Sequence, residues 1–150
     1  MIRDATENDL LKMVELGEEF YNSTILKKYI PCDPDSLGML ILQCIEQPNG
    51  VALVIEESGV LIGGFIGMVV PVYWNINYKV AQQIAWFVTP SKRSFRSIML
   101  LKRWEEIAKE KGASIVFSGA KKDERFKGME HLFNRHGYDE LENLHVKGIS

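Results

Sequence analysis

At 150 residues the chain is long enough for one domain that buries about two-thirds of its unfolded surface, and its 46% hydrophobic and 25% charged residues are ordinary for a globular protein. A formal net charge of -2 excludes a strong general attraction to nucleic acid or to anionic lipid. Cys32 and Cys44 are too few and too loosely spaced for a disulfide framework or a zinc site. We expect both to be buried thiols in a reducing compartment.

Neither a signal peptide nor a membrane span is expected. The N-terminal residues carry charges where a signal peptide has its apolar core. The longest apolar stretch, near Val60 to Val72, is shorter than the ~20 residues that a spanning helix needs, and its glycines and proline suit a strand better. We therefore expect a cytoplasmic protein with one domain over residues 1–150.

The first third of the chain predicts a short strand and two helices. Met1 to Arg3 is expected to be an edge strand, and Thr6 followed by acidic residues favours the start of a helix. Asp35 or Ser36 is expected to cap the second helix. The apolar residues that recur at helical spacing in the first helix are Leu10, Met13, Val14, Leu16 and Phe20.

Strand signals fill the middle of the chain. Val51 to Glu56 and Val60 to Val72 are rich in strand-forming residues, and Glu57-Ser58-Gly59 between them indicates a hairpin turn. A third strand is predicted over Tyr78 to Thr89. Pro71 to Asn77 is expected to be the loop that precedes it.

The last third predicts two helices and three short strands. A strong amphipathic helix follows Pro90 and ends at Gly112, a natural position for a C-terminal glycine. Ser114 to Ser118 predicts a strand, Phe126 to His136 a last helix, and Tyr138 to Ile149 two more short strands. The predicted order is β-α-α-β-β-β-α-β-α-β-β, an α/β fold class with a mixed sheet and helices on both faces.

Four segments in this order share a known pattern. They are Ile2-Arg3-x-Ala5-Thr6-x-x-Asp9, Trp86-Phe87-Val88-Thr89-Pro90-Ser91-Lys92-Arg93, Leu101 to Gly112, and His131 to Tyr138. They resemble the IRxATxxD entry, the V-x-P-x-x-R-G-x-G-x-G segment, the helix that continues it and the late Y-x-x-x-G-F segment of the GNAT superfamily of N-acetyltransferases. The resemblance covers nearly the whole chain and implies the GNAT acyl-CoA N-acyltransferase fold, with acetyl-CoA as co-substrate.

The central segment would bind the CoA pyrophosphate, because a helix that starts after a strand turns unpaired N–H groups and its positive dipole end toward an anion. The family's three glycines fall on Ser94, Arg96 and Ile98, and none of these is glycine. If residues 94–98 present their backbone amides to an open crevice, the interpretation as an enzyme is favoured. If the Arg96 or Ile98 side chain fills that crevice, the interpretation as a binding module is favoured. The residues expected to hold the cofactor are Phe87, Val88, Arg93, Ser94, Phe95, Arg96, Ser97 and Ile98.

A basic cluster surrounds this predicted helix start. It is interpreted either as an anion site or as a solvated helix surface. Its members are Lys92, Arg93, Arg96, Lys102 and Arg103.

Both catalytic positions that the resemblance implies are altered. The glutamate that often serves as base falls on Gln82, which can hold a water but accepts no proton usefully. The tyrosine acid falls on Phe133, which has no hydroxyl group. Tyr138 is the substitute that we name beside Gln82. Tyr73 and Tyr78, which flank the long hairpin, and His131 and His136, which suit a base near neutral pH, are the other candidates.

The aromatic residues divide into two predicted groups. Trp86 and Phe87 are expected to be core strand residues. Tyr73 and Trp74 lie in the predicted loop, a region that borders the acceptor site in the GNAT family. We expect them to contact substrate or a second subunit.

The sequence thus predicts an acetyl-CoA-dependent N-acetyltransferase acting on a small-molecule or protein amine, with no nucleic-acid or membrane partner, no metal, and a homodimer left open. The alternative is a catalytically inactive GNAT-fold protein that binds CoA or a protein. A compact chain with an altered phosphate loop is similar to members carried by tailed bacteriophages, which would place it in the host cytoplasm.

Overall fold

The computed structural model describes residues 1–93, 95–123 and 126–150. These residues form two compact units, Met1–Ser118 and Gly119–Ser150. No helix in the described ranges is both long enough and apolar enough to cross a membrane. A single domain over residues 1–150 stays a prediction.

The N-terminal segment folds as predicted apart from one helix cap. Its elements are β1 (Ile2–Asp4), the 3-10 turn η1 (Glu7–Asp9), α1 (Leu10–Asn22), the 3-10 turn η2 (Ile25–Lys28) and α2 (Pro34–Glu46). The prediction that Asp35 or Ser36 caps α2 is wrong. Pro34 takes the first helical position, so the cap is Asp33, whose carboxylate accepts the Ser36 N–H at 3.1 Å.

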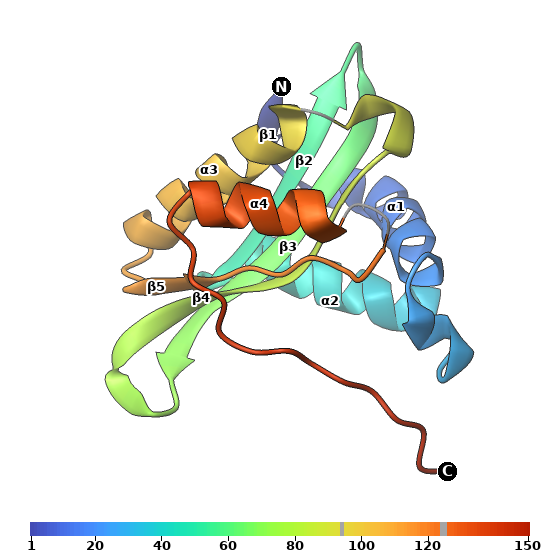
Figure 1. The fold of residues 1–150 in the computed structure, drawn as a ribbon. Helices are drawn as coiled ribbons and strands as arrows, with labels where there is room; N and C mark the ends of the chain where they lie inside the picture. The colour runs from blue at the N-terminus through green and yellow to red at the C-terminus, as the bar shows by residue number, and fades with distance from the viewer. Residues whose placement is uncertain (94, 124–125) are drawn as a thin grey trace. The chain divides into compact units, whose positions relative to one another are not determined.

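One mixed sheet forms the centre of the first unit (Figure 1). Its other strands are β2 (Gly50–Glu57), β3 (Val60–Val72), β4 (Asn75–Val88) and β5 (Ile115–Phe117). The spatial order is β1-β2-β3-β4-β5, so every strand pairs with its neighbour in sequence. All pairs are antiparallel except β4 with β5, which are parallel because α3 (Phe95–Glu110) connects them. The mixed α/β fold class is confirmed.

Helices cover both faces of the sheet, because β2 and β3 alternate two sets of buried side chains. Val54 and Ile66 belong to the core cluster that includes Met13 of α1 and Ile41 and Cys44 of α2. On the other face, Leu53 and Phe65 are paired across β2 and β3, and the Phe65 ring lies 4.6 Å from that of Trp104 in α3. Trp104 and Leu53 are fully buried. The sheet is therefore the middle layer of three.

The β3–β4 hairpin is longer and tighter than predicted. Val72 pairs with Asn75, so the turn consists of Tyr73 and Trp74 alone. The expected loop over residues 71–77 is thus mostly strand. The polar Asn75 and Asn77, which suggest a loop, lie instead on a two-stranded arm that projects beyond the helices (Figure 1).

A β-bulge interrupts the pairing of β3 with β4. Ile66 pairs with Ala85 and Gly67 pairs with Gln83, which leaves Ile84 as an extra residue. Close packing accompanies the bulge, because a Cβ on Gly67 would lie 2.8 Å from Trp104 Cη2 and 2.9 Å from Gln82 O. Only glycine fits at position 67 without a shift of its neighbours.

The second unit contains α4 (Phe126–Arg135), which ends before Gly137 with a φ of 81°. The two short strands predicted within Tyr138 to Ile149 are wrong, because residues 138–150 carry no strand. Leu144 and Val146 are two residues apart, as in a strand, but both are exposed, as are Leu141 and Ile149, so these residues bury no apolar face that would hold a strand.

Candidate functional site

The candidate site lies where β4 ends and α3 begins. β5 pairs with β4 only from Val80 to Gln82, and β4 continues beyond the end of this ladder to Val88. The N–H of Thr89 still donates to Ile62 O of β3 at 2.8 Å. A 3-10 turn, η3 (Pro90–Lys92), then leads into α3 at Phe95. The end of β4 is thus followed closely by the N-terminus of a helix. A helix N-terminus after a strand is a geometry that suits anion binding.

Arg93 is held against the end of β4. Its Nε donates to Val88 O at 2.7 Å, and its guanidinium carbon lies 5.6 Å from the centroid of the Phe87 ring. Phe87 is buried, with its ring 6.3 Å from that of Phe20 in α1. Three of the predicted cofactor residues, Phe87, Val88 and Arg93, are therefore brought together by direct contacts.

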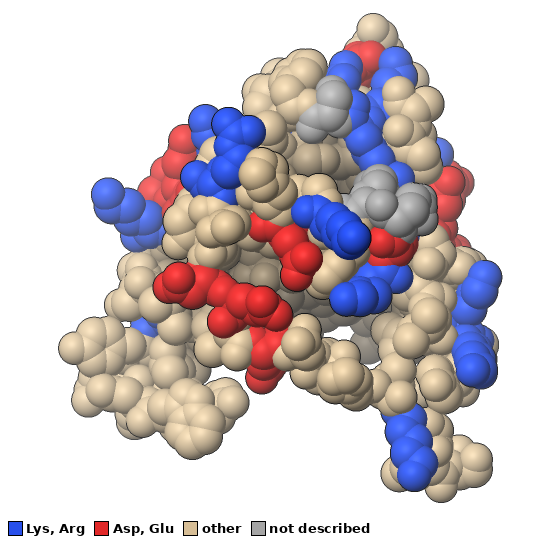
Figure 2. Space-filling model, in the orientation of Figure 1, with Lys and Arg blue, Asp and Glu red and all other residues tan. Residues whose placement is uncertain are grey.

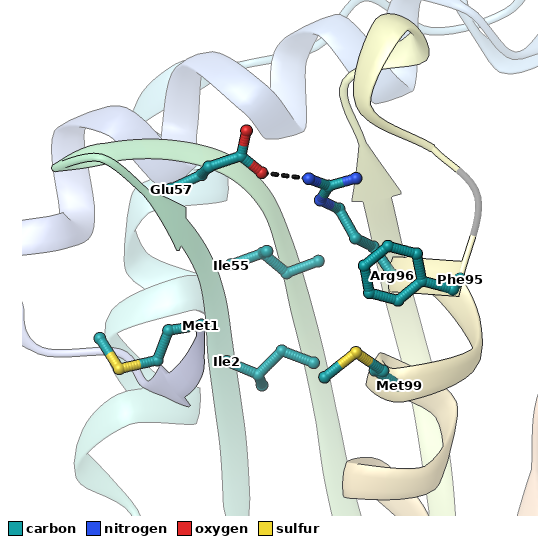
Figure 3. A pocket seen from close by; sticks show the side chains of 7 residues that line it. All are labelled: Met1, Ile2, Ile55, Glu57, Phe95, Arg96 and Met99. Carbon is teal, nitrogen blue, oxygen red and sulfur yellow. Dashed lines mark hydrogen bonds and ion pairs between the residues drawn. The ribbon is translucent and has the colours of Figure 1, made fainter.

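Lys92 and Arg96 converge on one carboxylate, that of Glu57 at the end of β2. Lys92 Nζ lies 2.8 Å from Glu57 Oε1. Arg96 donates to Glu57 Oε2, the contact drawn in Figure 3. Hydrogen bonds from Lys92 and then Arg96 lower the pKa of Glu57, so this carboxylate stays ionised at neutral pH. We call these three residues the Glu57 clamp.

Two residues of the clamp, Glu57 and Arg96, also line a small cavity. Arg96 donates to Lys92 O at 3.3 Å, and its guanidinium carbon lies 5.2 Å from the Phe95 ring centroid. Beneath it is a cavity of about 120 Å³, lined otherwise by apolar side chains. Those side chains are Met1, Ile2, Ile55, Phe95 and Met99 (Figure 3).

The rest of the predicted loop is only partly described. Ser94 lies outside the described residues. Ser97 and Ile98 are half-buried in the first turn of α3, and Phe95 is 59% exposed. The predicted basic cluster divides, because Arg103 contacts Glu106 at 3.1 Å on its own helix.

The two predicted catalytic residues lie in different units. Gln82 is exposed on β4, and its Nε2 donates to Gln83 O at 3.2 Å. Tyr138 follows α4 in the second unit, where its N–H donates to Phe133 O at 3.0 Å and its ring lies 5.2 Å from the Phe133 ring. Each is described within its own unit, and their roles stay predictions. In the described ranges, no group of three or more His, Cys, Asp and Glu gathers as a metal site.

The turn of the β3–β4 hairpin exposes large apolar side chains. Tyr73 and Trp74 are 81% and 84% exposed, and their rings lie 4.9 Å apart. Ile76 and Tyr78 are exposed beside them. The lobe at the lower left of Figure 2, where this hairpin lies in Figure 1, is almost entirely tan. Trp86, expected in the core, is half-buried.

Glu57 is the site residue that the sequence analysis missed. Its position before Ser58-Gly59 indicates a solvated hairpin end, and nothing local connects it to α3. Lys92 and Arg96 lie 35 and 39 residues farther along the chain. Only the pairing of β2, β3 and β4 brings the hairpin end and the helix start together.

Comparison by sequence found no matching family model and no matching curated protein. Solved structures match instead over nearly the whole chain. A predicted acetyltransferase from Clostridium acetobutylicum, solved with acetyl-CoA, has a TM-score of 0.76 at 17% identity and covers 98% of this chain and 95% of its own. An aminoglycoside acetyltransferase from an uncultured soil metagenomic sample, solved with sisomicin, has a TM-score of 0.72 at 21% identity, covering 100% and 95%.

A third similar structure is an aminoglycoside N-acetyltransferase, AAC(6')-Iy, in complex with a bisubstrate analogue that joins CoA to an acetylated neamine. Its TM-score is 0.74 at 18% identity, and the match covers 100% of this chain and 97% of that one. These identities are low, so the likeness is one of fold. The strand order, the crossover through α3 and these neighbours agree: the chain has the fold of the GNAT acetyltransferases.

Proposed function

We propose that the chain is an acyl-CoA-dependent N-acetyltransferase that transfers an acetyl group from acetyl-CoA to an amine. One observation carries the proposal: β4 runs past the end of β5 and leads through η3 into the N-terminus of α3. In the same fold, the Clostridium acetobutylicum structure was solved with acetyl-CoA. A strand that continues past its neighbour and leads to a helix N-terminus suits a ligand with an extended amide arm and a diphosphate.

The binding residues follow from this arrangement. The pantetheine arm would run along β4 at Phe87 and Val88, as an added strand does. The diphosphate would lie at the start of α3. The groups proposed to contact it are Arg93, Ser94, Phe95, Arg96, Ser97 and Ile98. Arg93 would have to exchange its bond to Val88 O for the ligand.

The chemistry is direct attack of a neutral amine on the thioester carbonyl. A C–N bond forms, the C–S bond breaks, and the electron pair leaves on the CoA sulfur. Backbone amides of β4 near Phe87 would polarise the carbonyl. The amine proton would pass to a water held by the Gln82 amide oxygen, and the CoA sulfur would leave as the thiolate. Positioning would supply much of the acceleration.

The second candidate is a catalytically inactive GNAT-fold protein that binds CoA or a protein partner. The observation that favours it is the Glu57 clamp, because Arg96 is engaged with an internal carboxylate at the loop where the ligand diphosphate would bind. The exposed Tyr73 and Trp74 are compatible with a partner surface.

Calorimetric titration with acetyl-CoA tests the proposal. We expect micromolar binding to the wild type and weaker binding to Arg93→Ala. Arg103→Ala is the matched control, because Arg103 lies on α3 but contacts Glu106 of the same helix. Binding lowered by Arg93→Ala alone supports the site and justifies a screen of amine acceptors by thiol release. No binding at millimolar acetyl-CoA contradicts the enzyme and leaves the protein-binding module.

A further inference from the structure

The cations at the start of α3 are bridged by a carboxylate from a distant part of the chain. Lys92 approaches one oxygen of Glu57. Arg96 donates to the other, as Figure 3 shows. A single anionic group that presents a separate oxygen to each of two cations is the arrangement that a phosphate group makes. In Figure 2, blue and red atoms lie side by side at the upper end of the view, where the β2–β3 hairpin lies in Figure 1.

We propose that Lys92 and Arg96 form an anion site that Glu57 occupies from within the chain, and that a phosphate-bearing ligand binds there by displacing the Glu57 carboxylate. For acyl-CoA the displacing group is the diphosphate, a ligand assignment that rests on the proposed function. Glu57 is thus an internal competitor. It lowers the affinity for weak anions and leaves the site to ligands with more negative charge.

The clamp is open enough to water for such an exchange. The side chains of Glu57, Lys92 and Arg96 are 34%, 44% and 25% exposed. Ion pairs this exposed contribute little to stability, because water solvates the separated charges almost as well. A diphosphate carries more negative charge than one carboxylate, so it can replace the carboxylate on both cations.

Displacement requires no change of the backbone. Glu57 pairs with Val60 across a turn in which Ser58 and Gly59 have φ values of 52° and 77°. Two left-handed residues in a two-residue turn are typical of a rigid hairpin. Rotation of the Glu57 side chain therefore suffices to release both cations. The neighbouring Glu56 contacts Arg3 at 3.4 Å and does not share the clamp.

The test compares the wild type with Glu57→Gln, which keeps the shape of the side chain and removes its charge. Glu106→Gln is the matched control, since Glu106 also pairs with an arginine of α3. Each protein is titrated with inorganic pyrophosphate, acetyl-CoA and S-acetylpantetheine, which lacks phosphate. We expect Glu57→Gln to bind the two phosphate ligands about three- to tenfold more tightly and S-acetylpantetheine unchanged.

The outcomes separate this inference from the proposed function. If Glu57→Gln binds pyrophosphate more tightly than the wild type and no variant binds acetyl-CoA, the result supports the anion site and contradicts the acyltransferase. Equal binding of both phosphate ligands to wild type and Glu57→Gln overturns the inference and leaves the acyltransferase standing. Adding Arg96→Ala to Glu57→Gln should abolish the gain. If Glu57→Gln does not fold, Glu57→Asp replaces it, because the shorter side chain holds the carboxylate farther from the two cations. A pyrophosphate affinity of Glu57→Asp equal to that of the wild type overturns the inference equally.

Discussion

The Arg3 guanidinium donates to both carboxylate oxygens of Asp9, at 2.8 Å to Oδ2 and 3.0 Å to Oδ1. Thr6 N–H donates to the same Oδ2 at 2.8 Å. Asp9 is buried, and Arg3 lies in the edge strand β1. The pair therefore ties the edge of the sheet to the start of α1.

This pair makes the stability of the fold depend on pH. The hydrogen bonds from Arg3 lower the pKa of Asp9 from 3.8 to about 2. A carboxyl whose folded pKa is lowered stabilises the fold above its unfolded pKa and loses that contribution as the pH falls through the folded one. The contribution is about 2 kcal/mol at pH 7 and disappears between about pH 4 and pH 2.

Asp9→Asn checks this by urea unfolding. We expect a loss of about 2 kcal/mol in the free energy of unfolding at pH 7, shrinking toward zero as the pH falls to about 2 and below. Glu15→Gln is the control, because Glu15 forms an exposed ion pair with Lys12 and should change stability by less than about 0.5 kcal/mol. A deficit of Asp9→Asn that stays constant with pH would contradict the role of the ionised carboxylate.

Gly67→Ala should destabilise the first unit. Its Cβ would approach Trp104 and the backbone oxygen of Gln82 more closely than van der Waals contact allows, so we expect a loss of about 1–3 kcal/mol. Gly128→Ala is the matched control: Gly128 lies in α4 with open space around its Cβ, and alanine there should stabilise by about 0.5–1 kcal/mol. Thermal unfolding of both variants measures the contrast.

The same change should destabilise the fold to very different extents at two tryptophans. Trp104→Ala leaves a cavity between α3 and the sheet and should lower the free energy of unfolding by about 3–5 kcal/mol. Trp74→Ala, at 84% exposure, should cost less than about 0.5 kcal/mol. Chemical denaturation followed by circular dichroism reads both. A large loss for Trp74→Ala would mean that the hairpin turn is buried in solution, by a second copy for instance.

Trp104→Phe should destabilise the fold less than the loss of a hydrogen-bonded indole would. The reason is that the Trp104 Nε1 has no hydrogen-bond partner among the described residues. We expect about 1–2 kcal/mol, set by lost packing against Phe65. The same denaturation measures it.

Gln82→Glu tests the proposed chemistry. A carboxylate at this position can take the amine proton directly, so we expect the rate of thiol release to rise about tenfold or more once an acceptor is found. Gln83→Glu is the control, since the next residue on a strand points to the opposite face. A rise in both variants would indicate a general charge effect and not a base at position 82.

Local signals in the sequence predict most of the elements. Gly112 and Gly137 end helices with φ values of 82° and 81°, as their positions predict. The Glu57 clamp could not be predicted, because it depends on a sheet register that joins residues 35 and 39 positions apart. The prediction of a loop over residues 71–77 is wrong because the polar Asn75 and Asn77 lie in a strand. The prediction of two strands in the C-terminal tail is wrong because apolar residues alone do not make a strand.

The extra residue at Ile84 reverses the odd–even order of β4. Val88 and Trp86 pair with Gly63 and Phe65, whereas Gln82 pairs with Met68. Side chains of paired residues share a face, so Gln82 lies on the same side of the sheet as Phe87 and not, as counting by twos implies, on that of Val88. Deleting one residue at the bulge would turn Gln82 toward the other helical layer while Phe87 and the helix start stayed in place. One residue with no partner across the ladder thus decides which layer of the molecule the proposed chemistry faces.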